Sequence, residues 1–430
     1  MKKILCVAFL CIMSLTAFAQ SGTNSPYSQY GLGILSEQSS GFNRGMNGLG
    51  LGFHEHNQVN YLNPASYSAI DSLTFIFDAG ISGQITNFSE NGTKLNANNG
   101  NFEYVVAGFR AFRHVGVSFG LVPLTNVGYN YSSTNYIDEG KKGTYTNAYS
   151  GDGGLHQVYL GAGWEPFKGF SLGANFGYLW GTENRSLVTS FSETYANTLS
   201  KYYTVDVRSY NLNVGAQYTA KLNKKDAITI GATYTMGHKL HSDPELQVIS
   251  TNSETAVSDT TTFTVKNGLE IPNVYSAGFM YNHNDQLKFG VDYSLQKWAK
   301  IDFPQYSVVN NVPQYALESG LYKDRQKVTV GAELCPSAYG RNFFGRIHYR
   351  AGVSYATPYI KINGQDGPKE ISASLGFGIP IMNQFNNRSI LNISAQWVHQ
   401  SAKDLITENT FRINIGITFN EGWFAKWKVQ

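Results

Sequence analysis

The tripeptide His54-Glu55-His56 is the first cluster of side chains that could do chemistry, because imidazole and carboxylate groups bind metal ions. Residues i and i+2 point the same way only in an extended strand, and no third ligand follows at a spacing typical of zinc sites. We therefore interpret these residues as a solvated polar turn, with a metal site as the alternative. The sequence predicts no metal ion and no other cofactor.

The basic residues Arg346, His348 and Arg350 alternate along the chain, so a strand would place all three on one face. Such a row could attract an anionic head group such as a carboxylate. It could also brace a polar interior by pairing with acidic residues, for which the candidates are Asp292, Glu333 and Glu103. Buried charges are usually paired, so we favour bracing.

No catalytic motif accompanies these charged residues. The sequence has no phosphate-binding loop and no His-Glu-x-x-His pattern. A serine–histidine site assembled from distant strands would leave no such trace, because sites of that type are defined by geometry rather than by sequence position. We predict no catalytic residues and interpret the chain as a protein other than an enzyme.

The N-terminal end of the sequence has the pattern of a cleavable signal peptide. Lys2 and Lys3 precede an apolar stretch from Ile4 to Leu15, and Ala17-Phe18-Ala19 forms a small-x-small cleavage site before Gln20. The apolar stretch is shorter than the ~20 residues that a membrane-spanning helix needs. We predict a signal peptide over residues 1–19 and export of the remainder.

The composition of the chain is typical of a membrane β-barrel. Aromatic residues make up 14% of the sequence, glycines number 44 and charged residues make up only 15%, whereas a soluble domain has ~25% charged residues. No second long apolar run is present, because a barrel spreads its apolar residues over one face of many strands. The net charge of +3 is too small to indicate binding of nucleic acid.

Strict alternation of apolar with polar residues is the strongest structural signal. From Phe411 to Phe419 every second residue is Phe or Ile, and the residues between them are Arg, Asn, Gly and Thr. A helix would scramble this pattern within two turns, whereas a transmembrane strand produces it. About fourteen such strands can be counted. They begin near Leu73, Phe102, Val115, Gln157, Phe170, Tyr203, Ala227, Asn273, Gln286, Lys327, Arg346, Glu370, Leu391 and Thr410.

The connections between these strands are alternately long and short. Arg113-His114 is a short one, whereas Gly83 to Asn101 and Gly237 to Pro272 are long. Barrels with both termini in the periplasm have short periplasmic turns and long extracellular loops. The sequence thus predicts an all-β fold, a transmembrane antiparallel β-barrel of about fourteen strands over residues 72–420, and a C-terminal periplasmic tail over residues 421–430.

Residues 20–71, ahead of the first strand, do not alternate. They include a glycine-rich run with Gly45, Gly48 and Gly50, and an Asn63-Pro64-Ala65 box just before the barrel. The segment is too polar to span lipid. It could be a periplasmic leader or a plug inside the lumen.

A glycine-rich stretch followed by an Asn-Pro-Ala box resembles the FadL/TodX family of hydrophobic-compound transporters. The matching residues are Gly45, Gly48, Gly50, Asn63, Pro64 and Ala65. The resemblance implies fourteen strands, an N-terminal hatch inside the barrel and passive uptake of apolar ligands. The segments Ser25–Gly31 and Asn420–Trp427 also look like outer-membrane barrels of Bacteroidetes-type bacteria, where the secretion accessory protein PorV has this fold.

The family resemblance implies that a ligand leaves sideways through an opening associated with a kinked third strand. Here the third predicted strand contains Gly120 and Pro123. Glycine weakens a strand and proline cannot donate to the sheet ladder, so we expect a lateral gap from Gly120 to Pro123. The alternative is a strand end at which Pro123 merely begins a loop.

The resulting interpretation is a monomeric barrel, surrounded by outer-membrane lipid, that carries hydrophobic or amphipathic small molecules across the outer membrane. Apolar ligands need apolar walls, so we expect inward apolar residues to line the path. The candidates are Ile76, Val106, Val122, Leu179 and Met280. The alternatives are a PorV-like accessory for protein secretion or surface assembly, and a general porin with an unplugged lumen.

Overall fold

A closed antiparallel β-barrel dominates the computed structural model, which describes residues 22–137, 143–193, 195–338, 340–381 and 389–422. The predicted signal peptide and most of the predicted C-terminal tail lie outside the described residues. The strands of the wall are β2 (Phe75–Glu90), β3 (Thr93–Phe112), β4 (Val115–Pro123), β5 (Thr125–Tyr136), β6 (Thr144–Phe167), β7 (Phe170–Phe191), β8 (Thr198–Lys221), β9 (Asp226–Thr235), β14 (Val274–His283), β15 (Leu287–Gln296), β18 (Arg325–Leu334), β19 (His348–Ala356), β22 (Lys369–Ile381), β23 (Ser389–Ser401) and β24 (Thr407–Glu421).

Each strand of the wall pairs with the next one along the chain, except that β4 and β5 do not pair with each other and both pair with β6; β24 closes the barrel by pairing with β2. Within the described residues, β4 and β5 are two parts of one interrupted third strand, so the barrel has fourteen strands. This confirms the predicted fold class. All the predicted strands are present; β3 and β6 begin well before the predicted positions, because their polar beginnings lack the apolar alternation.

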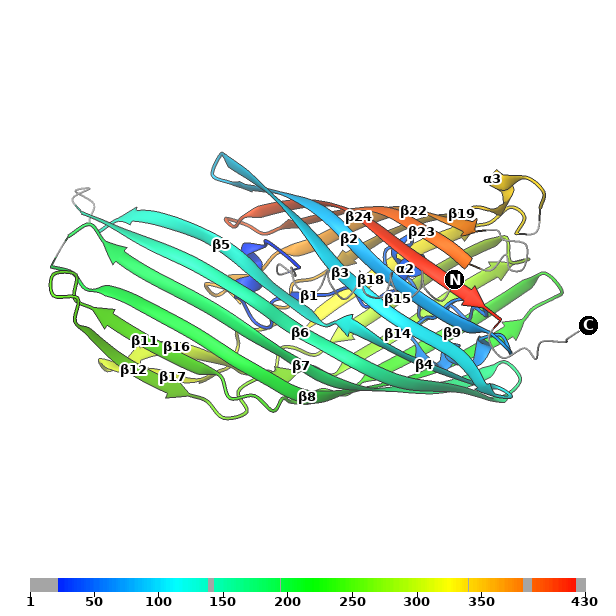
Figure 1. The fold of residues 1–430 in the computed structure, drawn as a ribbon, viewed down its shortest axis with the longest axis horizontal. Coiled ribbons are helices and arrows are strands. Elements are labelled where there is room, and N and C mark those ends of the chain that lie inside the picture. The colour runs from blue at the N-terminus through cyan, green and yellow to red at the C-terminus, as the bar shows by residue number, and fades with distance from the viewer. Residues whose placement is uncertain (1–21, 138–142, 194, 339, 382–388, 423–430) are drawn as a thin grey trace, which may run out of the picture.

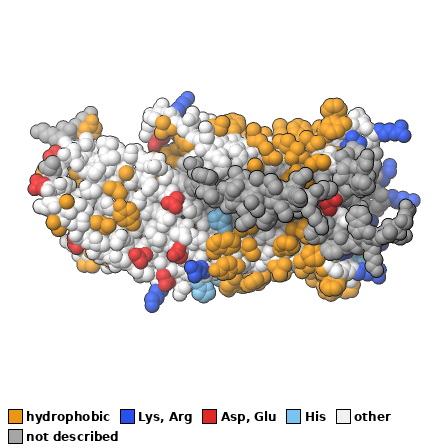
Figure 2. All heavy atoms as spheres, viewed as in Figure 1, with side chains coloured by type: hydrophobic (Ala, Val, Ile, Leu, Met, Phe, Trp, Pro, Cys, Tyr) orange, Lys and Arg blue, Asp and Glu red, His pale blue; other side chains and the backbone are white. Residues whose placement is uncertain are grey.

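The outer face of the barrel carries an apolar belt. In β24, Phe411, Ile413 and Ile415 are exposed, whereas Asn414 and Thr418 are buried, as the alternation predicts. Figure 2 shows the exposed hydrophobic side chains gathered around the right-hand part of the molecule, with few of them toward the left. Such a belt, flanked by polar surface, is what a lipid bilayer requires of a barrel wall.

The connections between the strands differ in length at the two ends of the barrel. The turns β3–β4, β6–β7 and β8–β9 lie together at what we call the short-turn end, on the right in Figure 1. At the opposite, long-strand end, β5 to β8 project beyond the belt (Figure 1). They are joined there by β11 (Glu245–Thr251) and β12 (Ser258–Thr264). Nearby lie β16 (Phe303–Val309) and β17 (Val312–Glu318).

Several segments that were predicted as long loops are strands, so this part of the prediction is wrong. Gly83 to Asn101 is a hairpin of β2 and β3, turned at Asn91-Gly92 with φ values of 47° and 82°. Asn-Gly with positive φ at both positions is the signature of a tight hairpin turn. Above the lipid both faces of a strand are polar, so backbone pairing continues without the apolar alternation that marks a membrane strand.

The N-terminal residues 22–71, which we call the plug, fold inside the barrel. Their elements are η2 (Pro26–Gln29), β1 (Ile34–Leu35), α2 (Gly41–Arg44) and η3 (Pro64–Ala69), and most of their side chains are buried. Asn63 caps η3 by accepting a hydrogen bond from the Ala65 N–H, and Pro64 occupies the first helical position. This confirms the predicted luminal hatch. No described helix is long and apolar enough to cross a membrane.

A row of four glycines seats the plug against the wall. Gly116, Gly163, Gly173 and Gly215 lie side by side on β4, β6, β7 and β8. A Cβ atom on Gly173 would lie 2.4 Å from the carbonyl carbon of Pro64, and one on Gly163 would lie 2.5 Å from its oxygen. The backbone of the Asn-Pro-Ala box therefore approaches the wall as closely as only glycine permits.

We predict that Gly173→Val displaces the Asn63-Pro64-Ala65 segment from the wall, because the new side chain must occupy the position of the Pro64 backbone. Overpacking of this kind costs ~1–3 kcal/mol. The measurement is the thermal unfolding midpoint in detergent, together with protease cleavage of the plug. The matched control is Gly177→Val in the same strand, where the nearest atom to a Cβ, Gln157 Oε1, is 3.4 Å away. Equal midpoints for the two variants would contradict the close packing of the plug backbone against Gly173.

Candidate functional site

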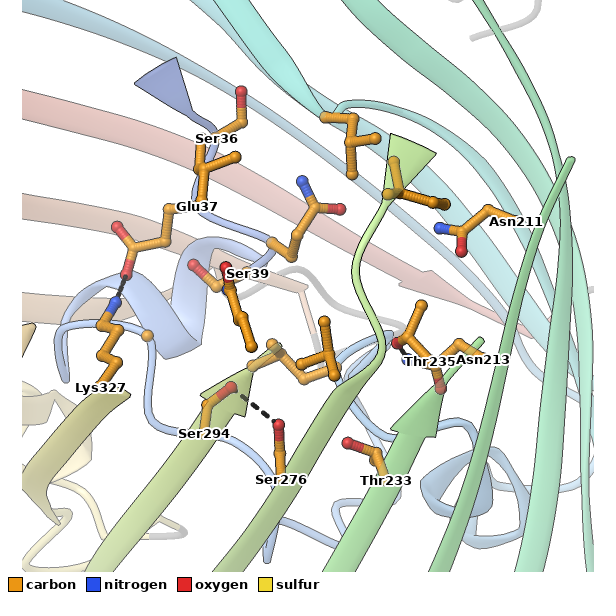
Figure 3. A pocket seen from close by; sticks show the side chains of 18 of the residues that line it. Ser36, Glu37, Ser39, Asn211, Asn213, Thr233, Thr235, Ser276, Ser294 and Lys327 are labelled. Atoms are coloured by element: carbon orange, nitrogen blue, oxygen red, sulfur yellow. Dashed lines mark hydrogen bonds and ion pairs between the residues drawn. The ribbon is translucent and has the colours of Figure 1, made fainter. Parts of the chain in front are cut away.

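A cavity of about 280 Å³ lies between the plug and one side of the barrel wall (Figure 3). The wall side is formed by β6, β7, β8, β9, β14, β15 and β18. The plug side includes Leu32, the segment Leu35–Ser39, Leu51 and Tyr61. The cavity is therefore the part of the lumen that the plug leaves open.

The wall of the cavity is made of uncharged polar side chains, as Figure 3 shows for several of them. They are the inward residues of successive strands, namely Gln157, Asn175, Asn211, Asn213, Thr233, Thr235, Ser276, Ser294 and Gln296. Some bond to each other: Asn213 donates to Thr235 at 3.0 Å, and Ser276 donates to Ser294 at 3.0 Å. The alternation that puts apolar residues on the lipid face puts these residues here.

Two acidic and two basic side chains also line the cavity: Glu37, Asp292, Arg325 and Lys327. Asp292 Oδ2 accepts hydrogen bonds from the N–H groups of Gly50 and Leu51, at 2.7 and 2.9 Å. Lys327 Nζ lies 3.8 Å from Glu37 Oε1 (Figure 3). Burial alone would raise the pKa of the Glu37 carboxyl, but Lys327 and two arginines together hold that pKa below its ordinary value.

Apolar side chains cover much of the remaining cavity surface. Those from the plug, from the break in the third strand and from the loop after β15 are Leu32, Leu35, Leu51, Leu62, Leu124 and Trp298. Trp298 is 2% exposed and its ring packs against Tyr322 and Tyr359. The cavity is thus amphipathic.

The third strand is interrupted next to this cavity. β4 pairs with β3 as far as Leu121↔Val105 and with β6 as far as Pro123↔His156. After Leu124, β5 continues along β6, but none of its described residues pairs with β3. Leu124 and Thr125 line the cavity.

Gly120 and Pro123 are therefore placed differently from the prediction. Gly120 is still paired with Val106 of β3, so the strands separate only after Leu121. Pro123 ends β4, as the alternative expected, but the chain continues as a strand instead of entering a loop. A role for this region as a lateral exit stays a prediction.

The plug occupies the space between β3 and β5. β1 pairs with Thr125 and Asn126 at the beginning of β5, and Asn24 Nδ2 donates to Asn98 O of β3 at 3.1 Å. Figure 1 shows the dark blue plug between these diverging strands. The wall is therefore completed at this point by hydrogen bonds to the plug instead of by strand pairing.

The five residues predicted to line an apolar path are all buried, but they do not lie together. Ile76, Val106 and Val122 share a cluster with plug residues, Met280 belongs to a second cluster and Leu179 to a third. None of the five lines the cavity. Inward apolar residues face the plug instead of open space, so the structure does not join them into one path, and their role in ligand movement stays a prediction.

The predicted basic row is only partly present. Arg350 Nε lies 2.6 Å from Glu333 Oε2 and His348 Nδ1 lies 3.3 Å from Glu333 Oε1, as the bracing interpretation expects. Arg346, however, ends α3 (Phe343–Arg346) in the β18–β19 connection, so its place in the row was wrong. Sequence alternation extends one residue pair beyond the point where β19 begins, and the helical turn breaks the register.

The other two acids predicted to pair with this row have different partners. Glu103 lies 2.9 Å from Arg44 of the plug, and Asp292 binds plug N–H groups. A further pair, Lys288 with Glu55 at 2.5 Å, also joins wall to plug. Glu103, Asp292 and Lys288 therefore hold the plug, a role that strand alternation could not indicate because the partners come from a non-periodic segment.

His54 and His56 point to different partners. His54 Nδ1 lies 2.8 Å from Gln217 Oε1, and His56 Nδ1 lies 2.9 Å from Asp71 Oδ2. Glu55 between them binds Lys288. The three side chains thus do not converge on one point, and the structure brings no group of three potential metal ligands together among the described residues.

A second pocket, of about 210 Å³, lies at the long-strand end and was not predicted. Its aromatic lining consists of Tyr30, Tyr129, Tyr149, Tyr203, Phe303 and Tyr315. Arg185 and Glu183, 2.8 Å apart, also line it. These residues come from the plug, the four strands β5 to β8 and the β16–β17 hairpin, so only the fold brings them together.

Comparison with known proteins places the fold. The family model described as BamG matches residues 1–430. No curated protein sequence matches the chain. A FadL homologue from Pseudomonas aeruginosa is similar in structure, with a TM-score of 0.62 and 14% identity over 90% of this chain and 99% of that one.

Two aromatic-hydrocarbon transport proteins are similar in structure as well. The toluene transporter TbuX of Ralstonia pickettii has a TM-score of 0.59 and 15% identity, covering 89% of this chain and 98% of its own. The monoaromatic hydrocarbon channel CymD has a TM-score of 0.58 and 16% identity, covering 88% and 97%. The predicted FadL/TodX-type fold is confirmed, and these neighbours are transport proteins instead of enzymes.

We predict that Glu333→Ala destabilises the barrel by ~3–5 kcal/mol, the usual cost of removing one partner from a buried ion pair. The change leaves Arg350 and Lys288, both buried, without their shared carboxylate. Urea unfolding in detergent, followed by tryptophan fluorescence, measures the difference. The control Glu318→Ala, on the exposed end of β17, should change the unfolding free energy by less than ~0.5 kcal/mol. If both variants have the wild-type free energy of unfolding, the ion pairs of Glu333 do not stabilise the barrel.

Proposed function

Because the chain belongs to the BamG family and has the fold of plugged transport channels, we propose that it carries hydrophobic or amphipathic small molecules passively across the outer membrane. The short-turn end then faces the periplasm and the long-strand end faces outward. The apolar belt contacts outer-membrane lipid, and the chain acts as a monomer.

The single observation that carries this proposal is the contact between the cavity and the interrupted third strand. Leu124 and Thr125 belong to both. The cavity therefore reaches the place where the plug segment, instead of strand pairing, joins β3 and β5. Separation of the strands at this point would let a molecule in the cavity leave sideways, without crossing the packed centre of the plug.

The route that we propose begins at the aromatic pocket of the long-strand end. Its tyrosines and Phe303 offer flat surfaces to an incoming ligand. Leu269 lines this pocket, whereas Leu32 and Trp298 line the cavity, and all three belong to one buried apolar cluster. The ligand would pass this cluster on the way inward. The named transport proteins of the same fold support a small-molecule ligand.

A general porin is not supported by the plug. The plug residues are largely buried against the wall. Asn47 of the plug donates hydrogen bonds to Ser354 and Ser372, two wall residues that do not line the cavity. A polar channel through the barrel would need the plug to leave these contacts.

We predict that Leu124→Trp lowers uptake of apolar ligands at least tenfold, because the larger ring fills the boundary between cavity and strand break. The measurement is uptake of radiolabelled dodecanoate and toluene by Gram-negative cells that express the chain and lack other barrels of this fold. A small sugar serves as the solute control.

The matched variant is Phe119→Trp, on the lipid-facing side of β4. It should leave uptake unchanged. Wild-type cells that take up no more dodecanoate or toluene than cells without the chain would refute the transport proposal. Equal uptake by wild type and Leu124→Trp would refute the exit at the strand break.

A second candidate function is that of an accessory in protein secretion or surface assembly, and one feature favours it. The predicted Gly237–Pro272 loop contains β11 and β12, which extend the wall. Among described residues β12 pairs only with β11, and most of its side chains are exposed. An extended segment of another protein could add a strand to such an edge.

We predict that, under this second function, replacing Glu245–Thr264 with a short Gly-Ser linker leaves dodecanoate uptake intact but reduces the display of surface proteins severalfold. Protease shaving of whole cells followed by mass spectrometry measures the display. A matched deletion of the Phe303–Glu318 hairpin tests whether the effect belongs to β12. Unchanged display after both deletions removes this candidate.

A further inference from the structure

Hydrogen-bond acceptors without partners are concentrated around the cavity. Among the described residues that line it, buried oxygens with no hydrogen-bond partner occur at the ends of two amides, two carboxylates and two hydroxyls. They are Asn211 Oδ1, Asn213 Oδ1, Asp292 Oδ1, Glu37 Oε1, Ser39 Oγ and Tyr61 OH.

The wall itself creates this surplus of acceptors. The NH₂ group of Asn211 is used by Gln157 Oε1 at 2.7 Å, and that of Asn213 by Thr235 Oγ1 at 3.0 Å. The other Asp292 oxygen is used by the plug backbone. Figure 3 shows Asn211 and Asn213 reaching from β8 toward the cavity. One N–H of each amide is therefore occupied within the wall, while the oxygen of the same amide has no hydrogen-bond partner among the described residues.

A pure hydrocarbon does not suit such a surface. Buried acceptors that lose water without gaining a donor weaken binding, so an alkane or a simple aromatic molecule would have to leave these oxygens hydrated. A ligand that carries several O–H groups would satisfy them directly. The cavity thus differs from a pocket that is lined by apolar side chains alone, because it also offers hydrogen-bonding groups.

The charges of the cavity favour a neutral ligand. Glu37 and Asp292 balance Arg325 and Lys327, so the lining offers no excess of either sign. The leucines that line the cavity offer an apolar surface, which suits an alkyl chain.

We infer that the cavity binds a neutral, hydroxyl-rich head group, such as a hexose, carried on an apolar tail. This inference rests on the proposed transport function and names the ligand class for the same site. The head group donates hydrogen bonds to Asn211, Asn213 and Asp292, while the tail lies along Leu32, Leu35 and Leu124 toward the strand break.

The test compares three probes with the same eight-carbon tail: octyl β-glucoside, octan-1-ol and octanoate. Binding is measured by isothermal titration calorimetry on the purified chain in amphipol, below the micelle concentration of each probe. Wild type should bind octyl β-glucoside at least tenfold more tightly than octan-1-ol or octanoate. The double variant Asn211→Leu/Asn213→Leu should reduce this preference to less than threefold, with octan-1-ol affinity unchanged.

Asn135→Leu, on the exposed part of β5, is the matched control and should keep the wild-type preference. Retained octan-1-ol binding and heat-dependent gel mobility show that each variant is folded. Equal affinity of wild type for the glucoside and octan-1-ol, tightest binding of octanoate, or an unchanged preference in the double variant would each overturn the inference.

The cell uptake assay, repeated with radiolabelled octyl β-glucoside beside dodecanoate and toluene, separates this inference from the proposed function. If apolar probes enter cells but the glucoside has no preference in calorimetry, the inference fails and transport stands. If the glucoside binds preferentially but no probe enters cells, the cavity chemistry stands and transport fails.

Discussion

The close contact between the plug backbone and the inner wall is the constraint on which the rest of the structure depends. Four neighbouring glycines remove the side chains that would otherwise hold the segment from Asn63 to Ser68 away from β4, β6, β7 and β8. This contact decides where the plug lies. It thereby decides which part of the lumen is filled and which part remains as the cavity.

The polar character of the inner wall follows from the same contact. A plug with little regular secondary structure has many backbone and side-chain groups that need hydrogen-bond partners. The wall supplies them, for example Asp292 to two plug N–H groups and Glu103 to Arg44. An apolar lumen would leave these groups unsatisfied. The polar face of each strand thus serves the plug as well as the cavity.

The interrupted third strand is the place where the plug takes part in the wall itself. β5 keeps its pairing with β6 but pairs with β1 instead of β3. The backbone groups of this region remain satisfied only while the plug is in place. Between β3 and β5 the plug segment therefore takes the place that strand pairing has in the rest of the described wall.

The sequence by itself determined the number of membrane strands, their inward and outward faces, and the presence of a non-periodic segment ahead of them. It could do so because lipid imposes a strict period of two on every strand that crosses it. The same rule fails above the lipid, where β5 to β8 continue with polar residues on both faces, and at Arg346, where a helical turn replaces the expected strand. Only the tertiary structure decided that Glu103 and Lys288 bind the plug, that Ile76 and Met280 lie beneath it, and that polar residues from seven strands meet at one cavity. These outcomes depend on how a segment without periodicity packs against the wall, and no local pattern encodes that packing.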